Sequence, residues 1–370
     1  MKRKRLMILI WNLGIGGMQK RVRDIIKDIS GNYPDWEVHI LVRDYYPRLF
    51  NEEIASFNRV YVRYSPVNNF FLTKFSKLPW VVWEYLKIGP DVCLTFLSHL
   101  SSLLVIAKLL IFWKKSRLVL NEGILTSKFL QIHSKNIQLE EFFVRRLYAL
   151  ADKIIVPTLA IKSELTSAYG LSPKSILVIP NWTLFPKMKP LNPKFDLLYV
   201  GRFEKEKNLL RVVDLVKDLK RMKPDISLCL IGEGSQEQAI ERAVVKKGLT
   251  QNVTIVDPQE DVSPFLRTSK IFIILSKNEG LPNVILEAAM AQVPSIVGNF
   301  DGVNELIEHQ KTGFIVRSSQ DATRYASMLL DNDKLRRNIG KRAQQQVIKK
   351  FSYRNQQKFI AQGIFNRKSG

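Results

Sequence analysis

Cysteine is scarce in this sequence, and its scarcity excludes several ways of stabilising a fold or building a site. The 370 residues include two cysteines, Cys93 and Cys229, which lie far apart inside apolar runs. Two such residues provide neither a disulfide framework nor the closely spaced ligands of a zinc site. We expect both to be buried small hydrophobic side chains, a usage that is consistent with a reducing compartment.

Long apolar runs are missing as well. The longest, residues 103–113, is interrupted by Lys108, whereas a helix that crosses a bilayer needs about 20 apolar residues. Residues 2–5 are basic, but the apolar run that follows them, residues 6–11, is about half as long as a usual signal-peptide core. We therefore expect a cytoplasmic protein that is soluble or peripheral to a membrane.

Acidic residues are few relative to basic ones. The chain has 34 Asp and Glu against 57 Lys and Arg, a formal net charge of +23. Such an excess attracts anions, whether nucleic acid, anionic lipid or a phosphorylated substrate, and charge alone does not distinguish them. No recognised nucleic-acid-binding motif is present. The length and the apolar fraction of 46% predict a globular protein of two domains.

Short β-branched runs alternate with amphipathic stretches along the whole chain, as is typical of doubly wound parallel sheets. In the first half, the pattern predicts strands at residues 6–10, 37–42, 91–96, 117–120 and 153–156. In the second half, it predicts strands at residues 197–200, 227–231, 253–256, 271–275, 294–297 and 313–316. Helices are expected between them, for example at residues 18–30, 138–149, 208–221, 235–247 and 282–292.

Between the two series, residues 182–193 contain Pro186, Pro190 and Pro193, a density that disfavours both helix and strand. We predict an α/β protein with two doubly wound, Rossmann-like domains that face each other across a cleft at the carboxyl ends of their strands. The predicted division is a domain at 1–185, a linker at 186–194, a domain at 195–350, and a C-terminal helix at 351–370 that packs back toward the first domain.

The segment from residue 271 to residue 287 contains the main candidate site. A buried strand ends near residue 275, Glu279 lies in the loop after it, and Glu287 lies in the next helix. Backbone N–H groups at the helix start, such as those of Leu281 and Asn283, make an anion site suited to a diphosphate. The two carboxylates could accept hydrogen bonds from sugar hydroxyls. The alternative is one glutamate near a helix cap and one on the surface.

With its continuation through residue 297, this segment resembles the Glu-x7-Glu signature of retaining glycosyltransferases with the GT-B fold. That large group builds lipopolysaccharide, glycolipid and surface-polysaccharide sugars. Residues 199–208 resemble its phosphate loop, residues 231–235 its glycine turn, and residues 302–307 with 311–316 its closing pattern. At residues 257–258 the chain has Asp-Pro where the group usually has Gly, which leaves the preference for the nucleotide base open.

The resemblance implies roles for particular residues of the second half. Arg202 and Lys207 would bind the donor diphosphate and neutralise charge on the leaving phosphate; without the other motifs, they would read as solvated residues at a helix start. Glu279 would contact the transferred sugar and Glu287 the nucleotide ribose. The remaining donor-binding positions that it implies are Gly201, Gly280, Leu281 and Asn283.

In the first half, Gly16 and Gly17 follow the first strand and precede a helix, where glycine lets a backbone approach a ligand closely. Their spacing differs from the Gly-x-Gly-x-x-Gly pattern of dinucleotide-binding loops, which argues against a dinucleotide site. By resemblance they would contact the donor. His99 is a candidate catalytic and acceptor-binding residue, with a locally packed histidine as the alternative. Glu122 is a candidate acceptor contact.

Two stretches, residues 70–83 and 109–117, interleave large apolar side chains with lysines. They suit a bilayer interface or, alternatively, the ends of core helices with solvated lysines. Together these features predict a hexosyltransferase or N-acetylhexosaminyltransferase on the inner face of the cytoplasmic membrane. Its partners would be a nucleotide-sugar donor, with UDP favoured and GDP open, a glycan or lipid-linked acceptor, and an anionic membrane surface.

We expect no metal, no other cofactor and no nucleic-acid partner. The acceptor would be a glycolipid, a lipopolysaccharide or a polysaccharide precursor, and transfer would retain the anomeric configuration. Two alternatives belong to other classes. A GT-B-like isomerase would change a nucleotide sugar without any acceptor, and a basic nucleic-acid-binding protein would show tight, salt-sensitive binding.

Overall fold

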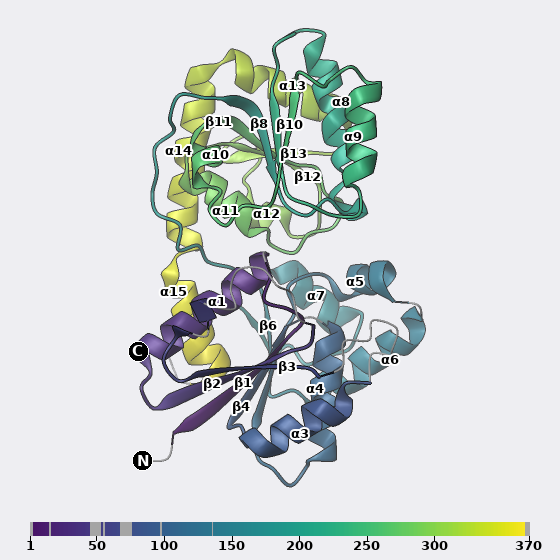
Figure 1. Ribbon diagram of the computed structural model, residues 1–370, viewed down its shortest axis with the longest axis vertical. Helices are drawn as coiled ribbons and strands as arrows, with labels where there is room; N and C mark the ends of the chain where they lie inside the picture. The colour runs from purple at the N-terminus through teal and green to yellow at the C-terminus, as the bar shows by residue number, and fades with distance from the viewer. Residues whose placement is uncertain are drawn as a thin grey trace. The chain divides into compact units, whose positions relative to one another are not determined.

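The computed structural model describes residues 3–14, 16–44, 53–54, 56–66, 76–96, 98–134 and 136–366. By its internal contacts the chain divides into two compact units. The first unit is Met1–Pro180 with Asn355–Gly370, and the second unit is Asn181–Arg354. Each unit is built on its own parallel sheet with helices packed against it (Figure 1).

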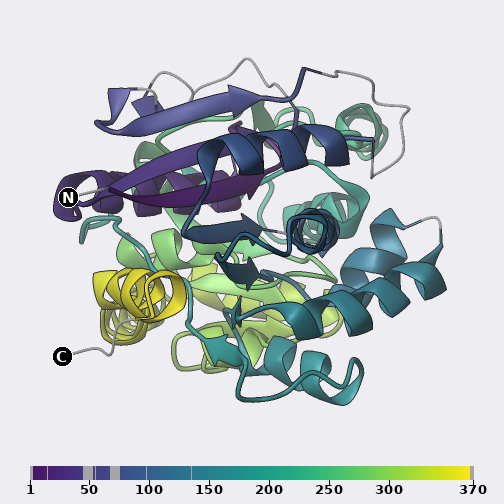
Figure 2. The ribbon, with the colours of Figure 1, turned by 90° about the horizontal axis from the view of Figure 1, so that it is seen from below.

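The sheet of the first unit has seven strands within the described residues, all parallel, in the order β3-β2-β1-β4-β5-β6-β7. Figure 2 shows these strands lying side by side. The strands are β1 Lys4–Ile10, β2 Trp36–Val42, β3 Val60–Tyr64, β4 Val92–Phe96, β5 Arg117–Asn121, β6 Lys153–Val156 and β7 Ile176–Val178. The helices are α1 Gly17–Asn32, α3 Leu78–Ile88, α4 Ser98–Leu110, α5 Thr126–His133, α6 Ile137–Leu147, α7 Leu159–Ser167 and the 3-10 turn η1 Tyr148–Leu150.

The second unit contains six parallel strands in the order β10-β9-β8-β11-β12-β13. They are β8 Phe195–Val200, β9 Leu228–Ile231, β10 Val253–Val256, β11 Ser269–Ile274, β12 Ser295–Gly298 and β13 Gly313–Val316. Its helical elements are η2 Lys205–Lys207, α8 Leu209–Lys220, α9 Glu237–Lys246, α10 Ser263–Arg267, α11 Asn283–Met290, α12 Val303–Leu306, α13 Ser319–Asp331 and α14 Asp333–Lys350.

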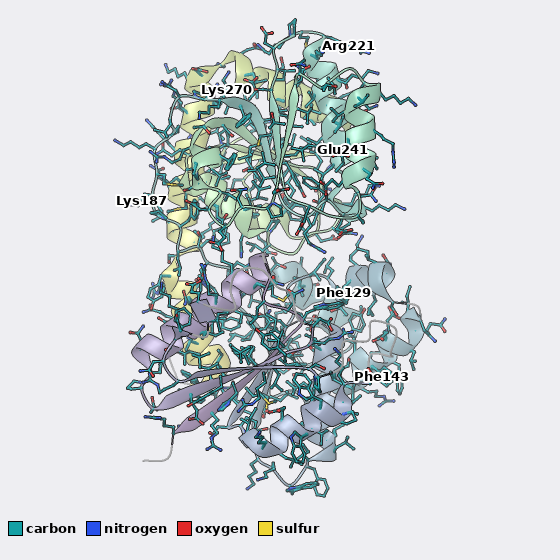
Figure 3. The ribbon with its side chains drawn as sticks, in the orientation of Figure 1. Phe129, Phe143, Lys187, Arg221, Glu241 and Lys270 are labelled. Atoms are coloured by element: carbon teal, nitrogen blue, oxygen red, sulfur yellow. The ribbon has the colours of Figure 1, made fainter. Side chains whose placement is uncertain are left out.

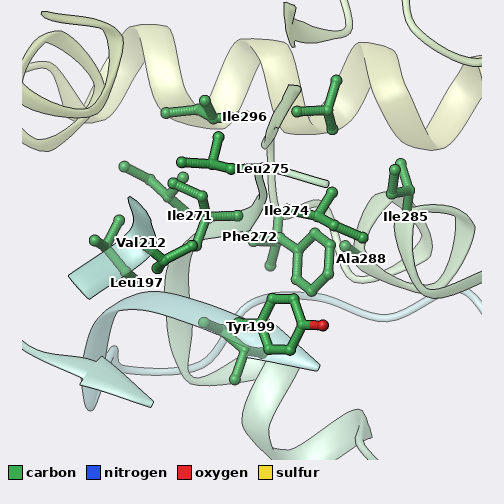
Figure 4. Close-up of a cluster of buried hydrophobic side chains, with 14 of the residues drawn as sticks. Leu197, Tyr199, Val212, Ile271, Phe272, Ile274, Leu275, Ile285, Ala288 and Ile296 are labelled. Carbon is green, nitrogen blue, oxygen red and sulfur yellow. The ribbon is translucent and has the colours of Figure 1, made fainter. Parts of the chain in front are cut away.

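In each sheet the first strand, β1 or β8, lies in the middle, and the strand order runs outward from it in both directions. This is the doubly wound pattern. The prediction of an α/β fold with two Rossmann-like domains is therefore confirmed. In the second unit the strands bury continuous apolar runs because helices cover both faces of the sheet. Figure 4 shows Tyr199 and Phe272 from β8 and β11 packed with Ile285 and Ala288 of α11.

Several charged side chains of the second unit lie on its exterior. Arg221 and Glu241 project from the end of α8 and from α9 into solvent (Figure 3). Lys270 forms an ion pair with Asp196 at 2.8 Å. The apolar faces of α8 and α9 point inward, so their charged outer faces follow directly from the amphipathic periodicity of the two helices.

Residues 181–194 contain neither helix nor strand, as expected for a segment with this proline content. They are hydrogen-bonded to the second unit along their length. The Met188 N–H donates to the Met290 carbonyl at 3.0 Å, and the Leu191 N–H donates to the Arg267 carbonyl at 2.7 Å. The segment is therefore part of the second unit, to which its backbone is hydrogen-bonded, and is not a free linker.

The end of the chain returns to the first unit. Helix α15, Tyr353–Lys358, continues as one π-helical segment, Phe359–Ile364. Buried Gln356 donates from Nε2 to the Asp24 carbonyl of α1 at 2.7 Å, and the Arg117 guanidinium donates to the Ile364 carbonyl at 2.9 Å. These contacts fasten the last helix to α1 and to the start of β5.

Gly340 marks a close contact between α14 and Gln292, the second residue after α11. A Cβ atom at this position would lie 1.9 Å from the Gln292 carbonyl oxygen, which is a backbone atom. We expect Gly340→Ala to lower the unfolding free energy by about 1–3 kcal/mol, because the two backbones would have to separate. Calorimetric unfolding of the purified variant measures this change.

Gly31 in α1 provides the matched control, since a Cβ atom there would meet nothing within 4 Å. Gly31→Ala is expected to leave stability unchanged or to raise it by about 0.5–1 kcal/mol. Equal melting temperatures for Gly340→Ala and the parent protein would contradict the close contact.

Candidate functional site

The predicted phosphate loop leaves the carboxyl end of β8 and is held against the turn after β9. A Cβ atom on Gly232, which has φ 148°, would lie 2.0 Å from the Gly201 carbonyl oxygen. The Phe203 N–H donates to the Glu233 carbonyl at 2.7 Å. Only glycine permits this approach at position 232, so the turn after β8 and the turn after β9 are packed backbone to backbone.

Tyr199 supports the same loop from beneath. Its hydroxyl donates to the Arg202 carbonyl at 3.0 Å. Burial, and next the negative charge of Glu279, raises the pKa of Tyr199 well above its ordinary value, so the hydroxyl keeps its proton and remains a donor. This buried contact fixes the backbone at Arg202, whose side chain extends outward.

Lys207 and Glu279 meet although 72 residues separate them in the sequence. The Lys207 Nζ lies 2.7 Å from the Glu279 Oε1, and their side chains are 16% and 11% exposed. The two loops are also joined where the Lys277 N–H donates to the Glu206 carbonyl at 3.3 Å. A cation and a carboxylate are thus held together at the carboxyl edge of β8 and β11.

Arg202 is placed differently from Lys207. Its guanidinium lies 3.5 Å from the Glu206 carboxylate and its side chain is 62% exposed. An exposed pair of this kind contributes little to stability, so the side chain can turn toward an incoming anion. The structure therefore brings Lys207 and Glu279 together and leaves Arg202 at the border of the same loop.

The start of α11 lies directly after Glu279. In the described part of the chain, the backbone N–H groups of Gly280 and Leu281 have no hydrogen-bond acceptor. Pro282 occupies the N-cap position, and α11 begins at Asn283. Because unsatisfied N–H groups and the helix dipole both favour negative charge, this end of α11 can receive an anion.

Glu287 is the fifth residue of α11 and is 7% exposed. The alternative that one of the two glutamates lies on the surface is therefore wrong. A carboxylate is seldom buried without partners, so this position is suited to polar contacts rather than to solvent. It lies on the same short helix whose amino end is the candidate anion site.

Asn181 holds the start of α11 and was missed by the sequence analysis. Its amide Nδ2 donates to the Leu281 carbonyl at 2.7 Å and to the Asn283 Oδ1 at 2.9 Å. An asparagine after a strand and a proline has no local feature that indicates partners a hundred residues away. Only the tertiary fold shows this support of the anion site.

In the first unit, Gly16 is the N-cap of α1 and Gly17 its first residue. The Gly16 carbonyl accepts from the Lys20 N–H at 3.0 Å, which closes the first helical turn. Before the helix, the Asn12 Oδ1 accepts from the Gln19 Nε2 at 2.7 Å. Asn12, at the carboxyl end of β1, is thus held against the first turn of α1. Donor contact by Gly16 and Gly17 stays a prediction.

Glu122 follows β5 and is 1% exposed. Its carboxylate accepts from the Ser101 hydroxyl at 2.9 Å and from the Tyr148 hydroxyl at 2.6 Å. Burial and the nearby Glu122 charge raise the pKa of Tyr148, which keeps that hydroxyl a donor. This placement favours a structural role that joins α4 and η1, and the acceptor contact stays a prediction.

His99 lies in the first turn of α4, and its side chain lies outside the described residues, so its catalytic role also stays a prediction. Residues 70–75 of the first aromatic stretch are likewise outside them. In the parts of the chain that are described, no helix is long and apolar enough to cross a membrane. In the same parts, no group of three or more His, Cys, Asp or Glu side chains could hold a metal ion.

Both cysteines are free and buried, as expected. The alternative that residues 109–117 are a core helix end fails for the aromatic side chains of that stretch. Phe112 is 81% exposed and Trp113 is 60% exposed.

Two family models match the chain one after the other. The model described as Glycosyltransferase Family 4 matches residues 15–183, and the model described as Glycosyl transferases group 1 matches residues 181–346. The second match contains Arg202, Lys207, Glu279 and Glu287. Together the two models cover most of both units.

Two curated relatives and one solved structure extend this likeness. The N-acetylgalactosamine-N,N'-diacetylbacillosaminyl-diphospho-undecaprenol 4-alpha-N-acetylgalactosaminyltransferase of Campylobacter jejuni is 24% identical over 90% of this chain and 92% of its own. The amylovoran biosynthesis glycosyltransferase AmsD of Erwinia amylovora is 30% identical over 60% of this chain and 68% of its own. Anabaena HepE, in complex with UDP and glucose, is 16% identical with a TM-score of 0.80, covering 97% of this chain and 99% of its own.

Proposed function

Because the chain belongs to the GT-B family of glycosyltransferases, we propose that it transfers a hexose or N-acetylhexosamine from a nucleotide-diphosphate donor with retention of the anomeric configuration. The observation that carries this proposal is the Lys207–Glu279 pair beside the amino end of α11. That arrangement offers a cation and backbone N–H groups to a diphosphate, and a carboxylate to the sugar joined to it.

The charges of the site suit the bond that breaks. As the bond between the anomeric carbon and the phosphate oxygen lengthens, negative charge gathers on the diphosphate, where Lys207, Arg202 and the α11 amides stabilise it. The sugar becomes positively charged, and Glu279 accepts hydrogen bonds from its hydroxyls. Glu287 accepts from the ribose. These side chains supply the cationic charge, and we propose that no metal is needed.

Retention follows, in this proposal, from attack on the face that the diphosphate leaves. The acceptor oxygen forms its bond to the anomeric carbon as the phosphate oxygen departs. The proton of the acceptor hydroxyl passes to that phosphate oxygen, so the leaving group acts as the base. Preorganised cations near the phosphate support such a step because they need not reorganise during it.

The donor and acceptor are proposed from the relatives. HepE is known in complex with UDP and glucose, which supports a UDP-sugar. The Campylobacter relative is named for a diphospho-undecaprenol-linked acceptor, and the Erwinia relative for amylovoran biosynthesis. These names support a lipid-linked or polysaccharide-precursor acceptor, used at the inner face of the cytoplasmic membrane.

Donor screening by thermal shift tests this proposal. A ligand at about 100 times its Kd adds about 2.7 kcal/mol to the unfolding free energy, so UDP and the matching UDP-sugar are expected to raise the melting temperature clearly. With a lipid extract as acceptor, the matching donor is expected to release UDP. NMR of the product is expected to show the donor's anomeric configuration, with activity unchanged by EDTA.

Other outcomes contradict the proposal in distinct ways. An inverted anomeric configuration rules out retention but keeps the transfer. Conversion of the donor without any acceptor indicates the isomerase, and tight, salt-sensitive binding of oligonucleotides with no response to nucleotide sugars indicates the nucleic-acid-binding alternative.

A further inference from the structure

A hollow of about 790 Å³ opens on the first unit, away from the glycine loop of α1. It is lined where β4, β5 and β6 begin, by Asp91, Arg117 and Lys153, and by the end of α4 with the loop after it. Gly16, Gly17 and Glu122 lie at the opposite, carboxyl edge of the same sheet. The hollow is therefore separate from the predicted substrate-binding positions of this unit.

Positive charge dominates the lining of this hollow. Five cationic side chains line it: Lys108, Lys114, Lys115, Arg117 and Lys153. Its two carboxylates, Asp91 and Asp152, already accept hydrogen bonds within the unit. Asp91 accepts from the Arg5 N–H at 2.7 Å, and Asp152 accepts from the Leu118 N–H at 2.7 Å. The hollow thus has a surplus of cations that its own acids do not balance.

Two of these cations face solvent. Lys114 and Lys115 are exposed, and neither forms an ion pair within the described residues. Lys108 is paired with Asp152 at 3.3 Å, and the Lys153 ammonium donates to the Lys174 carbonyl at 3.0 Å. Lys114 and Lys115 are therefore the groups most available to an external anion.

The border of the hollow is apolar and aromatic. Phe112, which lines it, is 81% exposed, and Trp113 beside it is 60% exposed. Their rings meet edge to face with centroids 5.3 Å apart. Leu109 and Leu110, at the end of α4, are 48% and 53% exposed. Four of the five residues from 109 to 113 thus present large exposed apolar side chains immediately before Lys114 and Lys115.

Helix α3, which packs against α4 (Figure 1), also has exposed large apolar side chains. It exposes Trp83 by 66% and Leu86 by 40%. Large apolar side chains that gather on a protein surface beside cations mark a contact surface. Tryptophan and phenylalanine next to lysine is the composition of a bilayer interface, where the rings enter the headgroup region and the cations meet lipid phosphates.

We propose that the hollow and its aromatic border dock the first unit onto an anionic phospholipid surface. Lys114 and Lys115, with the cations behind them, bind headgroup phosphates, while Phe112 and Trp113 enter the interface. A nucleic acid would use the cations but not the adjoining leucines. A small free anion would be held by converging buried donors, whereas these lysines are open to solvent. The inference rests on the membrane location in the proposed function, but not on the sugar donor.

Sedimentation of the full chain with vesicles tests this surface. The parent protein is expected to bind vesicles of phosphatidylglycerol and phosphatidylcholine in equal parts, and not vesicles of phosphatidylcholine alone. Lys114→Gln with Lys115→Gln is expected to weaken binding about 25-fold, since each cation near an anionic surface contributes about five-fold. Phe112→Ser with Trp113→Ser is expected to weaken it about ten-fold or more.

The second unit supplies matched controls. Lys217→Gln with Lys246→Gln removes the same charge. Met222→Ser with Val245→Ser removes an exposed apolar side chain just after α8 and one from its neighbour α9. Neither pair is expected to change vesicle binding appreciably. All variants are expected to keep the parent melting temperature and its increase with UDP, because the substituted side chains are exposed and lie outside the donor site.

Four results would overturn the proposed docking surface. One is that the parent protein does not bind anionic vesicles, and another is that the Lys114/Lys115 and Phe112/Trp113 double variants both bind them as tightly as the parent. Inhibition of vesicle binding by low concentrations of inorganic phosphate, or tighter binding of oligonucleotides than of vesicles, would also contradict it. Failure of the proposed function would give a different result. UDP would then leave the melting temperature unchanged, whereas the parent protein would still bind vesicles and the variants would still bind them more weakly.

Discussion

Lys207→Ala is expected to lower kcat/KM for sugar transfer by about 10²–10³-fold while the protein remains folded. Removing one preorganised donor to a developing negative charge typically has an effect of this size. Lys207 is held for that task by its contact with Glu279 at 2.7 Å. Steady-state kinetics with the matching UDP-sugar and acceptor measures the loss.

Lys205 offers a control within the same turn. It belongs to η2 as Lys207 does, but it is exposed and forms no ion pair within the described residues. Lys205→Ala removes the same charge from the loop and is expected to leave kcat/KM nearly unchanged. If the two variants lost activity equally, the effect would belong to the general charge of the loop. Full activity in Lys207→Ala would eliminate its role with the diphosphate.

Glu279→Gln is expected to lower kcat about 100-fold with little change in the affinity for UDP, whereas Glu287→Gln is expected to weaken UDP binding about 10–100-fold. Hydrogen bonds to a charged acceptor contribute about 1.5–3 kcal/mol each. In the proposed arrangement, Glu279 contacts the sugar part of the donor and Glu287 contacts its ribose. Kinetics combined with calorimetric titration of UDP separates the two effects.

A structural role for Glu279 has a different signature. If the carboxylate served only to hold Lys207, Glu279→Gln would weaken UDP binding and reduce kcat/KM by the same factor. The double variant Lys207→Ala with Glu279→Gln would then be no worse than Lys207→Ala alone. Glu308→Gln, at an exposed position that pairs with Lys350 at 3.4 Å, is the matched control and is expected to behave as the parent protein.

The positions of the central strands along the chain could be predicted from the sequence, because central parallel strands bury continuous apolar runs. Strand β3 was missed for the same reason. It lies at the edge of its sheet, and none of its five side chains is fully buried, so it lacks that run. Residues 91–96 and 117–120 were predicted as strands, and β4 and β5 occupy Val92–Phe96 and Arg117–Asn121.

Only part of the candidate site could be predicted from the sequence. Glu279, Glu287, Lys207 and Arg202 could be named because a short motif carries each of them, but the motif does not tell which side chains meet. The partnership of Lys207 with Glu279 spans 72 residues. Glu122 shows the opposite case. Its position after a strand indicates a site residue, whereas its two buried hydroxyl donors come from separate elements that no local pattern connects to it.

The return of the chain end to the first unit matters for anyone who exchanges domains between related enzymes. The first unit consists of two stretches of sequence, Met1–Pro180 and Asn355–Gly370, and Gln356 is buried against α1. A chimera with a single crossover near residue 180 would place a foreign helix on α1. Two crossovers, the second near residue 354, would keep each core with its native partners, so the second unit should be exchanged as an insertion into the first rather than as a simple fusion.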